Sequence, residues 1–243
     1  MAVIFRLYTI ALVLAAAPAM GASPQRIVSL GLCTDQLLLQ LADRQQIASV
    51  SVWARHADMS YMIDAVGDIP LNSASIEEIL QFQPDLVVAS DYVAWNTVNF
   101  LRQLGVTVKQ VPVATSVDEI YAVLNQFGAW TGNSARASAL VAQMRLRLAE
   151  IERRYASRPR KSVIIYAPNG FTIGAETLEN DLFERAGYRN LAAEMGITGF
   201  QSISLESLIA ADPDVLQVDR DLSPQESLAT ATLEHPALAS LLR

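Results

Sequence analysis

One stretch of the chain occurs twice, and this repeat limits the folds that are available to it. The first copy runs over residues 75–88 and the second over residues 204–218. Each copy opens with a serine suited to cap a helix, places an acid in the first helical turn, and continues with apolar residues at helical spacing. A Pro-Asp pair then ends the helix, and the apolar run after it is typical of a buried strand. The repeat therefore predicts two related α/β lobes.

The rest of the first half alternates between strand and helix patterns. Apolar β-rich runs predict strands, and amphipathic runs predict helices between them. Such alternation favours a parallel sheet, which binds ligands beyond the carboxyl ends of its strands. Four candidates, Cys33, Trp53, Tyr92 and Trp95, lie just past such ends. Strands are predicted at residues 26–30, 47–52, 85–89 and 106–111, and helices at 36–42, 76–82 and 98–104.

Between the two copies of the repeat, the pattern predicts a pair of helices. A capping box at residues 116–119 begins the first helix, and Thr131-Gly132-Asn133 ends it. The second helix is predicted over 133–155, on the order of 33 Å long, which is enough to connect two lobes. After it, a strand is expected at 162–166, a loop at 167–174, a helix at 177–186 and a turn at 187–190.

Composition narrows the classes of function. The chain has 243 residues, of which 51% are hydrophobic, so it can form one large or two small α/β domains. Its net charge of −7 argues against nucleic acid or an anionic membrane surface as a partner, and no Lys/Arg cluster is recognised anywhere in the chain. Cys33 is the only cysteine, which excludes a disulfide framework, and two histidines, His56 and His235, cannot build a three-histidine metal site.

The amino terminus has the anatomy of a secretory signal peptide. Arg6 precedes an apolar run over residues 7–17 that is too short to span a bilayer, and small residues follow it. We expect cleavage between Ala19 and Ala22, so residues 1–22 are predicted to be removed. No cysteine lies at that junction, so no lipid anchor is expected there and the product should be free in its compartment.

With these features in place, the chain resembles the periplasmic substrate-binding proteins of ABC importers for vitamin B12, ferric siderophores and haem. In that class a long helix joins two lobes, and the resemblance spans residues 26–243. It is carried by residues 26–30, by Glu77 with Pro84-Asp85, by residues 187–192, and by Ser204-Leu205-Glu206 with Pro213-Asp214.

The resemblance implies two Rossmann-like lobes with central parallel sheets, in a protein that is soluble and monomeric in the periplasm. The expected division is a signal peptide at 1–22, an N-terminal lobe at 23–115, a helical connection at 116–158 and a C-terminal lobe at 159–243. Members of the class continue through a further strand and helix, so the C-terminal lobe is expected to be incomplete.

Glu77 and Glu206 occupy equivalent positions in the two copies. The simpler interpretation is that both acids stabilise helix dipoles, and this applies equally to Glu78. The resemblance implies that they dock into arginine pockets on the two permease subunits, and a protein with two related lobes needs matched charges for a twofold partner. A paired-carboxylate hydrolase is disfavoured, because such pairs face each other within roughly 5–10 Å and these acids lie on separate lobes.

Flat aromatic side chains in the predicted cleft loops suit a large ring-bearing or chelate ligand. Arg55 could pair with a carboxylate, Thr34 could donate to a polar group at a helix start, and His56 or Tyr61 could ligate haem iron. Cys33 is either a small buried residue, which we favour, or a thiol in the cleft. Trp130 is assigned to packing. The predicted ligand-binding residues are Cys33, Thr34, Trp53, Arg55, Tyr61, Tyr92, Trp95, Asn169, Phe171 and Phe200.

The resulting hypothesis is a binding protein that captures a ferric siderophore or a corrinoid and delivers it to the permease dimer of an ABC importer. Two alternatives stay open: a haem-binding member of the same class, and a periplasmic sensor or adaptor that reports on a ligand. An enzyme is disfavoured, since no nucleophile–base pair or phosphate loop is recognisable. We therefore predict no catalytic residue, metal site, cofactor or nucleic-acid partner.

Overall fold

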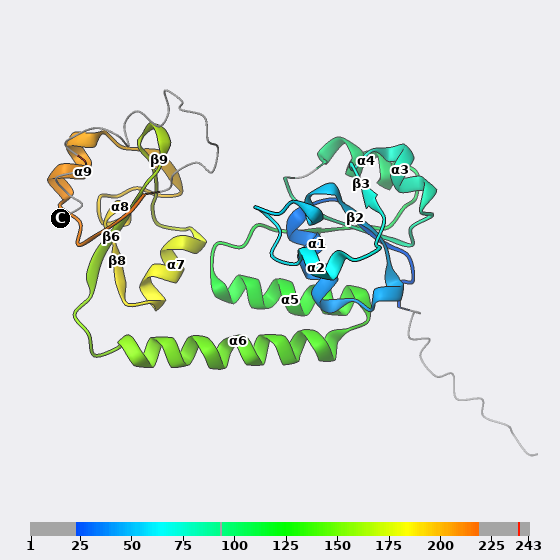
Figure 1. The fold of residues 1–243 in the computed structure, drawn as a ribbon, viewed down its shortest axis with the longest axis horizontal. Helices are drawn as coiled ribbons and strands as arrows, with labels where there is room; N and C mark the ends of the chain where they lie inside the picture. The colour runs from blue at the N-terminus through cyan, green and yellow to red at the C-terminus, as the bar shows by residue number, and fades with distance from the viewer. Residues whose placement is uncertain (1–22, 93, 219–237, 239–243) are drawn as a thin grey trace, which may run out of the picture.

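The computed structural model describes residues 23–92, 94–218 and 238, and the predicted signal peptide lies outside them. Figure 1 shows two lobes side by side, with two helices, α5 (Val117–Thr131) and α6 (Ser134–Tyr155), running beneath them. This arrangement confirms the predicted fold class of two α/β lobes joined by one long helix. Within the described residues, no helix is both long and apolar enough to cross a bilayer.

The N-terminal lobe is built on a five-stranded parallel sheet in the order β3-β2-β1-β4-β5. Its centre is fully buried, with Ile27, Val28, Val87 and Val88 at 0% exposure, as expected for a parallel sheet covered on both faces. The four predicted strands are present, and β3 was missed because it is two residues long. The strands are β1 (Ile27–Ser29), β2 (Ile47–Ser51), β3 (Leu71–Asn72), β4 (Leu86–Ser90) and β5 (Val108–Val111); the helices are α1 (Leu32–Leu41), α2 (Ile63–Val66), α3 (Ile76–Gln81) and α4 (Trp95–Gln103), with 3-10 turns η1 (Arg44–Gln46) and η2 (Val52–Arg55).

The C-terminal lobe contains a three-stranded parallel sheet in the order β10-β6-β8 and a separate antiparallel pair, β7 and β9. Two predictions were wrong here. The expected loop at 167–174 contains β7, and the expected turn at 187–190 contains β8, because both strands are too short to show an alternating pattern. The strands are β6 (Lys161–Tyr166), β7 (Phe171–Ile173), β8 (Tyr188–Asn190), β9 (Phe200–Ser202) and β10 (Val215–Val218); the helices are α7 (Leu178–Arg185), α8 (Leu191–Glu194) and α9 (Leu205–Ala211), with the 3-10 turn η3 (Pro168–Gly170).

The two copies of the repeat fold alike. Ser75 Oγ accepts a hydrogen bond from Glu78 N (3.4 Å) at the start of α3, and Ser204 Oγ accepts one from Ser207 N (3.2 Å) at the start of α9. Both serines are therefore helix caps, as the sequence predicted.

The aspartate of each Pro-Asp pair has a role that sequence reasoning missed. Asp85 accepts hydrogen bonds from the backbone N–H groups of Gln25 (2.7 Å) and Arg26 (3.0 Å), where β1 begins. Asp214 accepts from the backbone N–H (2.7 Å) and hydroxyl (2.8 Å) of Ser162, where β6 begins. The hydrogen bond from Ser162 N holds the pKa of Asp214 below its usual value. In both lobes the acid at the start of one strand thus satisfies the first donors of its parallel neighbour.

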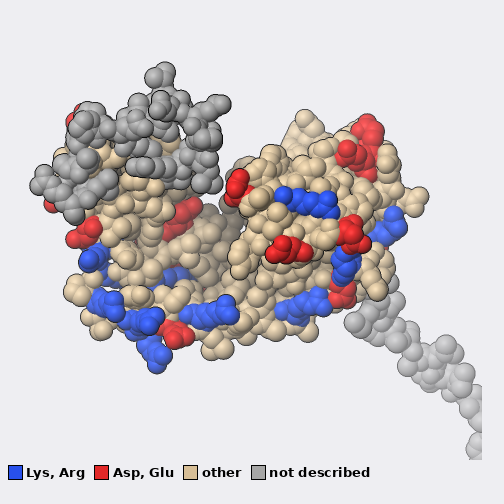
Figure 2. Space-filling view, viewed as in Figure 1, with Lys and Arg blue, Asp and Glu red and all other residues tan. Residues whose placement is uncertain are grey.

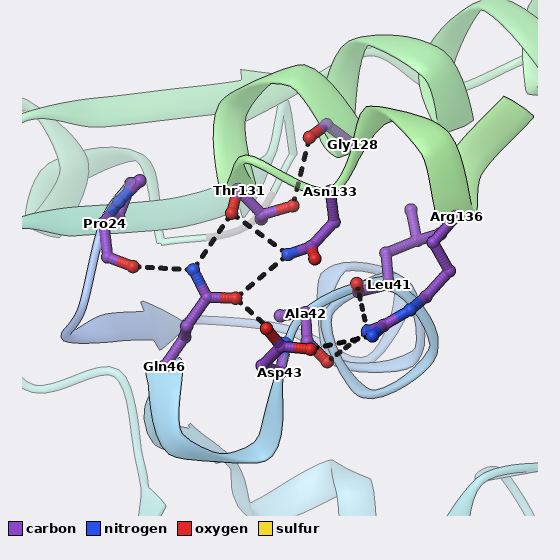
Figure 3. A network of polar contacts seen from close by, with 9 residues as sticks. All are labelled: Pro24, Leu41, Ala42, Asp43, Gln46, Gly128, Thr131, Asn133 and Arg136. Atoms are coloured by element: carbon purple, nitrogen blue, oxygen red, sulfur yellow. Dashed lines mark hydrogen bonds and ion pairs between the residues drawn. The ribbon is translucent and has the colours of Figure 1, made fainter. Parts of the chain in front are cut away.

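The amino-terminal end of α6 is tied to the N-terminal lobe (Figure 3). Asn133 Nδ2 donates to Gln46 Oε1 (2.9 Å), and Gln46 Nε2 donates to the Thr131 carbonyl oxygen (3.0 Å). Arg136 donates to the Leu41 carbonyl oxygen (2.7 Å), where α1 ends, and pairs with Asp43 (2.7 Å). These contacts fix the turn between α5 and α6 against the end of α1.

The other end of α6 is tied to the C-terminal lobe through one arginine. Arg185, in the last turn of α7, pairs with Asp118 of α5 (2.9 Å), Glu152 of α6 (3.1 Å) and Asp181 of its own helix (2.9 Å). Asp181 also accepts a hydrogen bond from the backbone N–H of Val117 (2.8 Å), where α5 begins. We call this group of charges the Arg185 clasp.

We predict that Arg185→Ala loosens the two lobes. Partly exposed ion pairs are each worth about 0.2–1 kcal/mol, so losing the clasp should lower the free energy of unfolding by about 1–2 kcal/mol. Spin labels at Gln81→Cys and Ala210→Cys, in a Cys33→Ser background, should give a broader distance distribution than in the parent. Arg189→Ala is the control, because Arg189 pairs with Glu194 inside its own lobe (2.9 Å). An unchanged distribution in Arg185→Ala would show that the clasp does not set the lobe orientation.

Candidate functional site

A hollow of about 360 Å³ lies beyond the carboxyl ends of β1, β2 and β3. This is the edge at which parallel sheets bind ligands. Of the predicted ligand-binding residues, Trp53 alone lies on its wall. Small polar side chains supply much of the remaining wall. The lining residues are Leu30, Ser51, Val52, Trp53, Asn72, Ser73, Ala74, Ala94 and Thr97.

Two buried polar side chains, Asp35 and Asn72, form hydrogen bonds that fix residues in the wall of this hollow. Sequence reasoning missed both. Asp35, in the first turns of α1, accepts hydrogen bonds from Ser51 N (3.0 Å) and Ser51 Oγ (2.5 Å). Asn72 donates to the Ser29 carbonyl oxygen (3.0 Å), to Ser49 Oγ (2.8 Å) and to the Val50 carbonyl oxygen (3.0 Å). The one sequence signal that could have identified Asp35 is its position as an acid in the first turn of an apolar helix.

Burial dominates the electrostatics of Asp35. The residue is 0% exposed. Burial raises the pKa of its carboxyl above the usual value, although hydrogen bonds from Ser29 and Ser51 act in the opposite direction. Because Asp35 holds Ser51 in place, its charge state bears on the shape of the hollow.

Cys33 and Thr34 are placed differently from expectation, because α1 begins at Leu32 and contains both residues. Thr34 is fully buried, donates to the Gly31 carbonyl oxygen (2.9 Å) and lies 2.8 Å from Ser29 Oγ. Its hydroxyl therefore does not reach the surface of the hollow. Cys33 is exposed, so the expectation that it packs in the core was wrong.

The segment after β2 carries three of the predicted residues. Trp53 lies in the 3-10 turn η2 and is 49% exposed, with its ring centroid 6.0 Å from that of His56. Arg55 is exposed, and one nitrogen of its guanidinium donates to the Gly67 carbonyl oxygen (2.6 Å). Tyr61 is 90% exposed.

The segment after β4 carries two more aromatic residues, Tyr92 and Trp95, and both are strongly exposed. Trp95 was expected in a loop, but it is the first residue of α4, directly after Ala94 in the left-handed region (φ 54°). A left-handed alanine is costly, and no sequence pattern predicts it. The helix therefore begins earlier than predicted and carries Trp95 on its first turn.

In the C-terminal lobe, the antiparallel pairing of β7 with β9 brings Phe171 and Phe200 together. Their rings are stacked, with centroids 5.8 Å apart and planes inclined by 9°, and both side chains are exposed. Asn169 is exposed in η3 just before β7, with a positive φ of 59°. The sequence selected these three residues separately, whereas the stacked pair follows from a strand pairing that it did not predict.

Glu77 and Glu206 are exposed in the first turns of α3 and α9, one on each lobe. Both helices lie on the sides of their lobes away from α6 (Figure 1). Figure 2 shows the two lobes separated by a notch above the joining helices. Among the described residues, no group of three or more His, Cys, Asp or Glu side chains could hold a metal ion.

Comparison with known proteins places these features in a family. The family described as "Periplasmic binding protein" matches residues 27–241. A "Cobalamin-binding protein" of Halobacterium salinarum is 32% identical over 202 residues, which is 81% of this chain and 54% of the relative. This chain therefore spans about half the length of the curated relatives it matches first.

Two solved structures share the fold. A possible iron-binding periplasmic solute-binding protein of Staphylococcus epidermidis is 26% identical, with a TM-score of 0.71 over 81% of this chain and 78% of that one. A periplasmic haem-binding protein of Pseudomonas aeruginosa is 25% identical, with a TM-score of 0.67 over 89% of this chain and 79% of that one.

We predict that Asp35 gives the protein a stability that falls as pH rises. Its folded pKa is raised, so the protonated form is favoured in the folded state, and that advantage is full below the unfolded value of about 4. The free energy of unfolding of the parent, measured relative to Asp35→Asn, should therefore decline as pH rises from about 4 through the folded pKa, and then level off. Urea titrations across this range measure it, with the exposed Asp58→Asn as control. A difference that grows with pH would contradict the assignment.

Proposed function

This chain belongs to the periplasmic binding protein family, and from that premise we propose that it captures a corrinoid and delivers it to the permease of an ABC importer. The observation that carries the proposal is the chemistry of the predicted ligand residues. Most of them are exposed aromatic side chains, which occur on both lobes. Trp53 lies on the wall of a hollow lined by small polar side chains, and Arg55 is the one cation in the set.

The shortage of cations separates the ligand classes. A ferric catecholate is strongly anionic and haem carries two propionates, so both need cationic partners. Arg55 is the only arginine among the predicted ligand residues, and one of its donors already binds the Gly67 carbonyl oxygen. A corrinoid presents a broad ring fringed with neutral amides, which aromatic faces and hydroxyl groups can contact. The name of the Halobacterium relative supports the same class.

Haem is the second candidate, because His56, whose ring lies beside that of Trp53, and Tyr61 are both exposed and either side chain could ligate iron. The haem-binding structure from Pseudomonas aeruginosa adds to its support. The ligand titration below also tests a neutral ferric siderophore. The uptake assay below also tests a sensor or adaptor role.

The proposal includes an order of events and a division of the chain. The leader at 1–22 exports the protein to the periplasm, where residues 23–115 and 159–243 act as the two lobes of a soluble monomer and residues 116–158 connect them. The rings of both lobes bind the ligand between them. Glu77 and Glu206 then meet cationic pockets on the permease dimer, one from each lobe. Their equivalent positions on α3 and α9 support this role.

We predict that cobalamin quenches the fluorescence of Trp53 or Trp95. Replacing the contacting tryptophan by alanine should weaken binding about tenfold or more, because ring stacking and buried apolar area are both lost. Fluorescence titration with cyanocobalamin, a neutral ferric hydroxamate and haem measures the preference, with Trp130→Phe as control. If haem binds and cobalamin does not, the ligand class is wrong. If Trp53→Ala and Trp95→Ala both leave affinity unchanged, the predicted site is wrong.

We also predict that Glu77→Arg with Glu206→Arg abolishes uptake and leaves ligand affinity within about threefold, since like charges facing each other across an interface cost several kcal/mol. The matched control is Asp64→Arg with Glu179→Arg, because these are also first-turn acids, on α2 and α7. Uptake by reconstituted transporter and affinity of the purified protein are measured together. Equal loss of ligand affinity in the Glu77 and Glu206 variant would contradict a docking role.

A further inference from the structure

The charge of this acidic chain is unevenly distributed. Residues 145–161 contain seven basic and two acidic residues, whereas the rest of the chain contains 11 basic and 23 acidic residues. The segment therefore carries +5 and the remainder −12. The expectation that no Lys/Arg cluster occurs anywhere in the chain is wrong for the last turns of α6 and the residues that follow. The argument from net charge against an anionic membrane surface therefore does not apply to this segment.

The arginines of this segment also differ from the others in their contacts. Among the described residues, none of its six arginines uses its guanidinium in a hydrogen bond or ion pair; Arg145 and Arg158 lie over the rings of Tyr121 (5.0 Å) and Tyr155 (4.8 Å). Every described arginine outside it donates at least one hydrogen bond: Arg26, Arg44, Arg55, Arg102 and Arg136 before it, and Arg185 and Arg189 after it.

Helix stability accounts for little of this cluster. Cations in the last helical turn interact favourably with the helix dipole, and this applies to Arg153 and Arg154. It does not apply to Arg147, two turns earlier, or to Arg160 and Lys161, beyond the helix. Figure 2 shows the blue side chains gathered over α6 and its end, on a face where Leu146 is 74% exposed.

We propose that this basic face, residues 145–161, binds an anionic phospholipid surface. The arginines from Arg145 to Arg154 extend along about 14 Å of α6, and further cations follow beyond its end, so the charge is extended and suits many headgroups better than a single anion. Arginine forms bidentate contacts with phosphate, and an exposed leucine among cations can enter the interfacial region. The acidic remainder of the chain is repelled by such a surface, so only this face is presented to it.

Binding through this face has a consequence for orientation. The helices α3 and α9, which carry Glu77 and Glu206, lie on the sides of their lobes away from α6 (Figure 1). A molecule held by the basic face therefore turns the proposed docking acids away from the same bilayer. Lipid binding and permease docking are then separate states, and the first does not require the second.

The test is flotation of the mature protein with vesicles of phosphatidylcholine alone or with about 30% phosphatidylglycerol. We expect binding to the anionic vesicles only, and its loss at about 0.5 M salt, because screening shortens the range of surface charge. Each cation near the surface is worth about fivefold in affinity, so Arg153→Gln, Arg154→Gln and Arg158→Gln together should weaken binding about a hundredfold.

A control variant separates the basic face from net charge. Gln81→Glu, Gln103→Glu and Gln126→Glu change the total charge by the same amount on other exposed helix positions, and this variant should bind nearly as the parent does. Inorganic pyrophosphate tests a free phosphate source. Failure of the parent to bind anionic vesicles, equal weakening in both triple variants, or pyrophosphate binding without vesicle binding would each overturn the proposal. Cobalamin titrations of the same variants keep this result distinct from the proposed transport function.

Discussion

The fixed attachment of α6 at both ends is the constraint on which the rest of the structure depends. At one end Asn133 and Arg136 bind the turn after α1, and at the other Arg185 of α7 reaches Asp118 and Glu152. The apolar side of α6, with Leu140, Met144 and Leu148, packs against the core of the N-terminal lobe. A continuous helix held in this way resists the bending that several flexible crossing strands would permit. The relative position of the lobes, and of the acids they carry, follows from it.

The repeat explains why the two lobes resemble each other in detail. In each copy a serine caps a helix, proline ends it, and the next aspartate satisfies the first donors of the adjacent parallel strand. The residues that end the helix thus also set the register at which β4 pairs with β1 and β10 pairs with β6. Local sequence and strand pairing agree here, as expected of a consistent fold.

Features with local causes were predictable from the sequence. Capped helices, long apolar strands and the α6 rod each carry their signal within a few residues. Features that depend on distant partners were not. The stacking of Phe171 on Phe200 requires the pairing of β7 with β9, and the burial of Thr34 depends on where α1 begins. The basic face was missed although it is present in the sequence, because its cations are interspersed with apolar and acidic residues and the rest of the chain is acidic.

The fixed position of the two lobes and the exposure of the aromatic side chains are connected. Where lobes close on a ligand, mobile side chains can remain loosely held until closure, but a frame that does not close must present its binding surface in advance. The hydrogen bonds from Ser51 to Asp35, and those from Asn72 to three acceptors, hold two residues that line the same hollow as Trp53. Phe171 and Phe200 are likewise held by a strand pair. Affinity for a ligand would then depend on ring surface that is already exposed, such as that of Trp53 on the N-terminal lobe and of Phe171 and Phe200 on the C-terminal lobe.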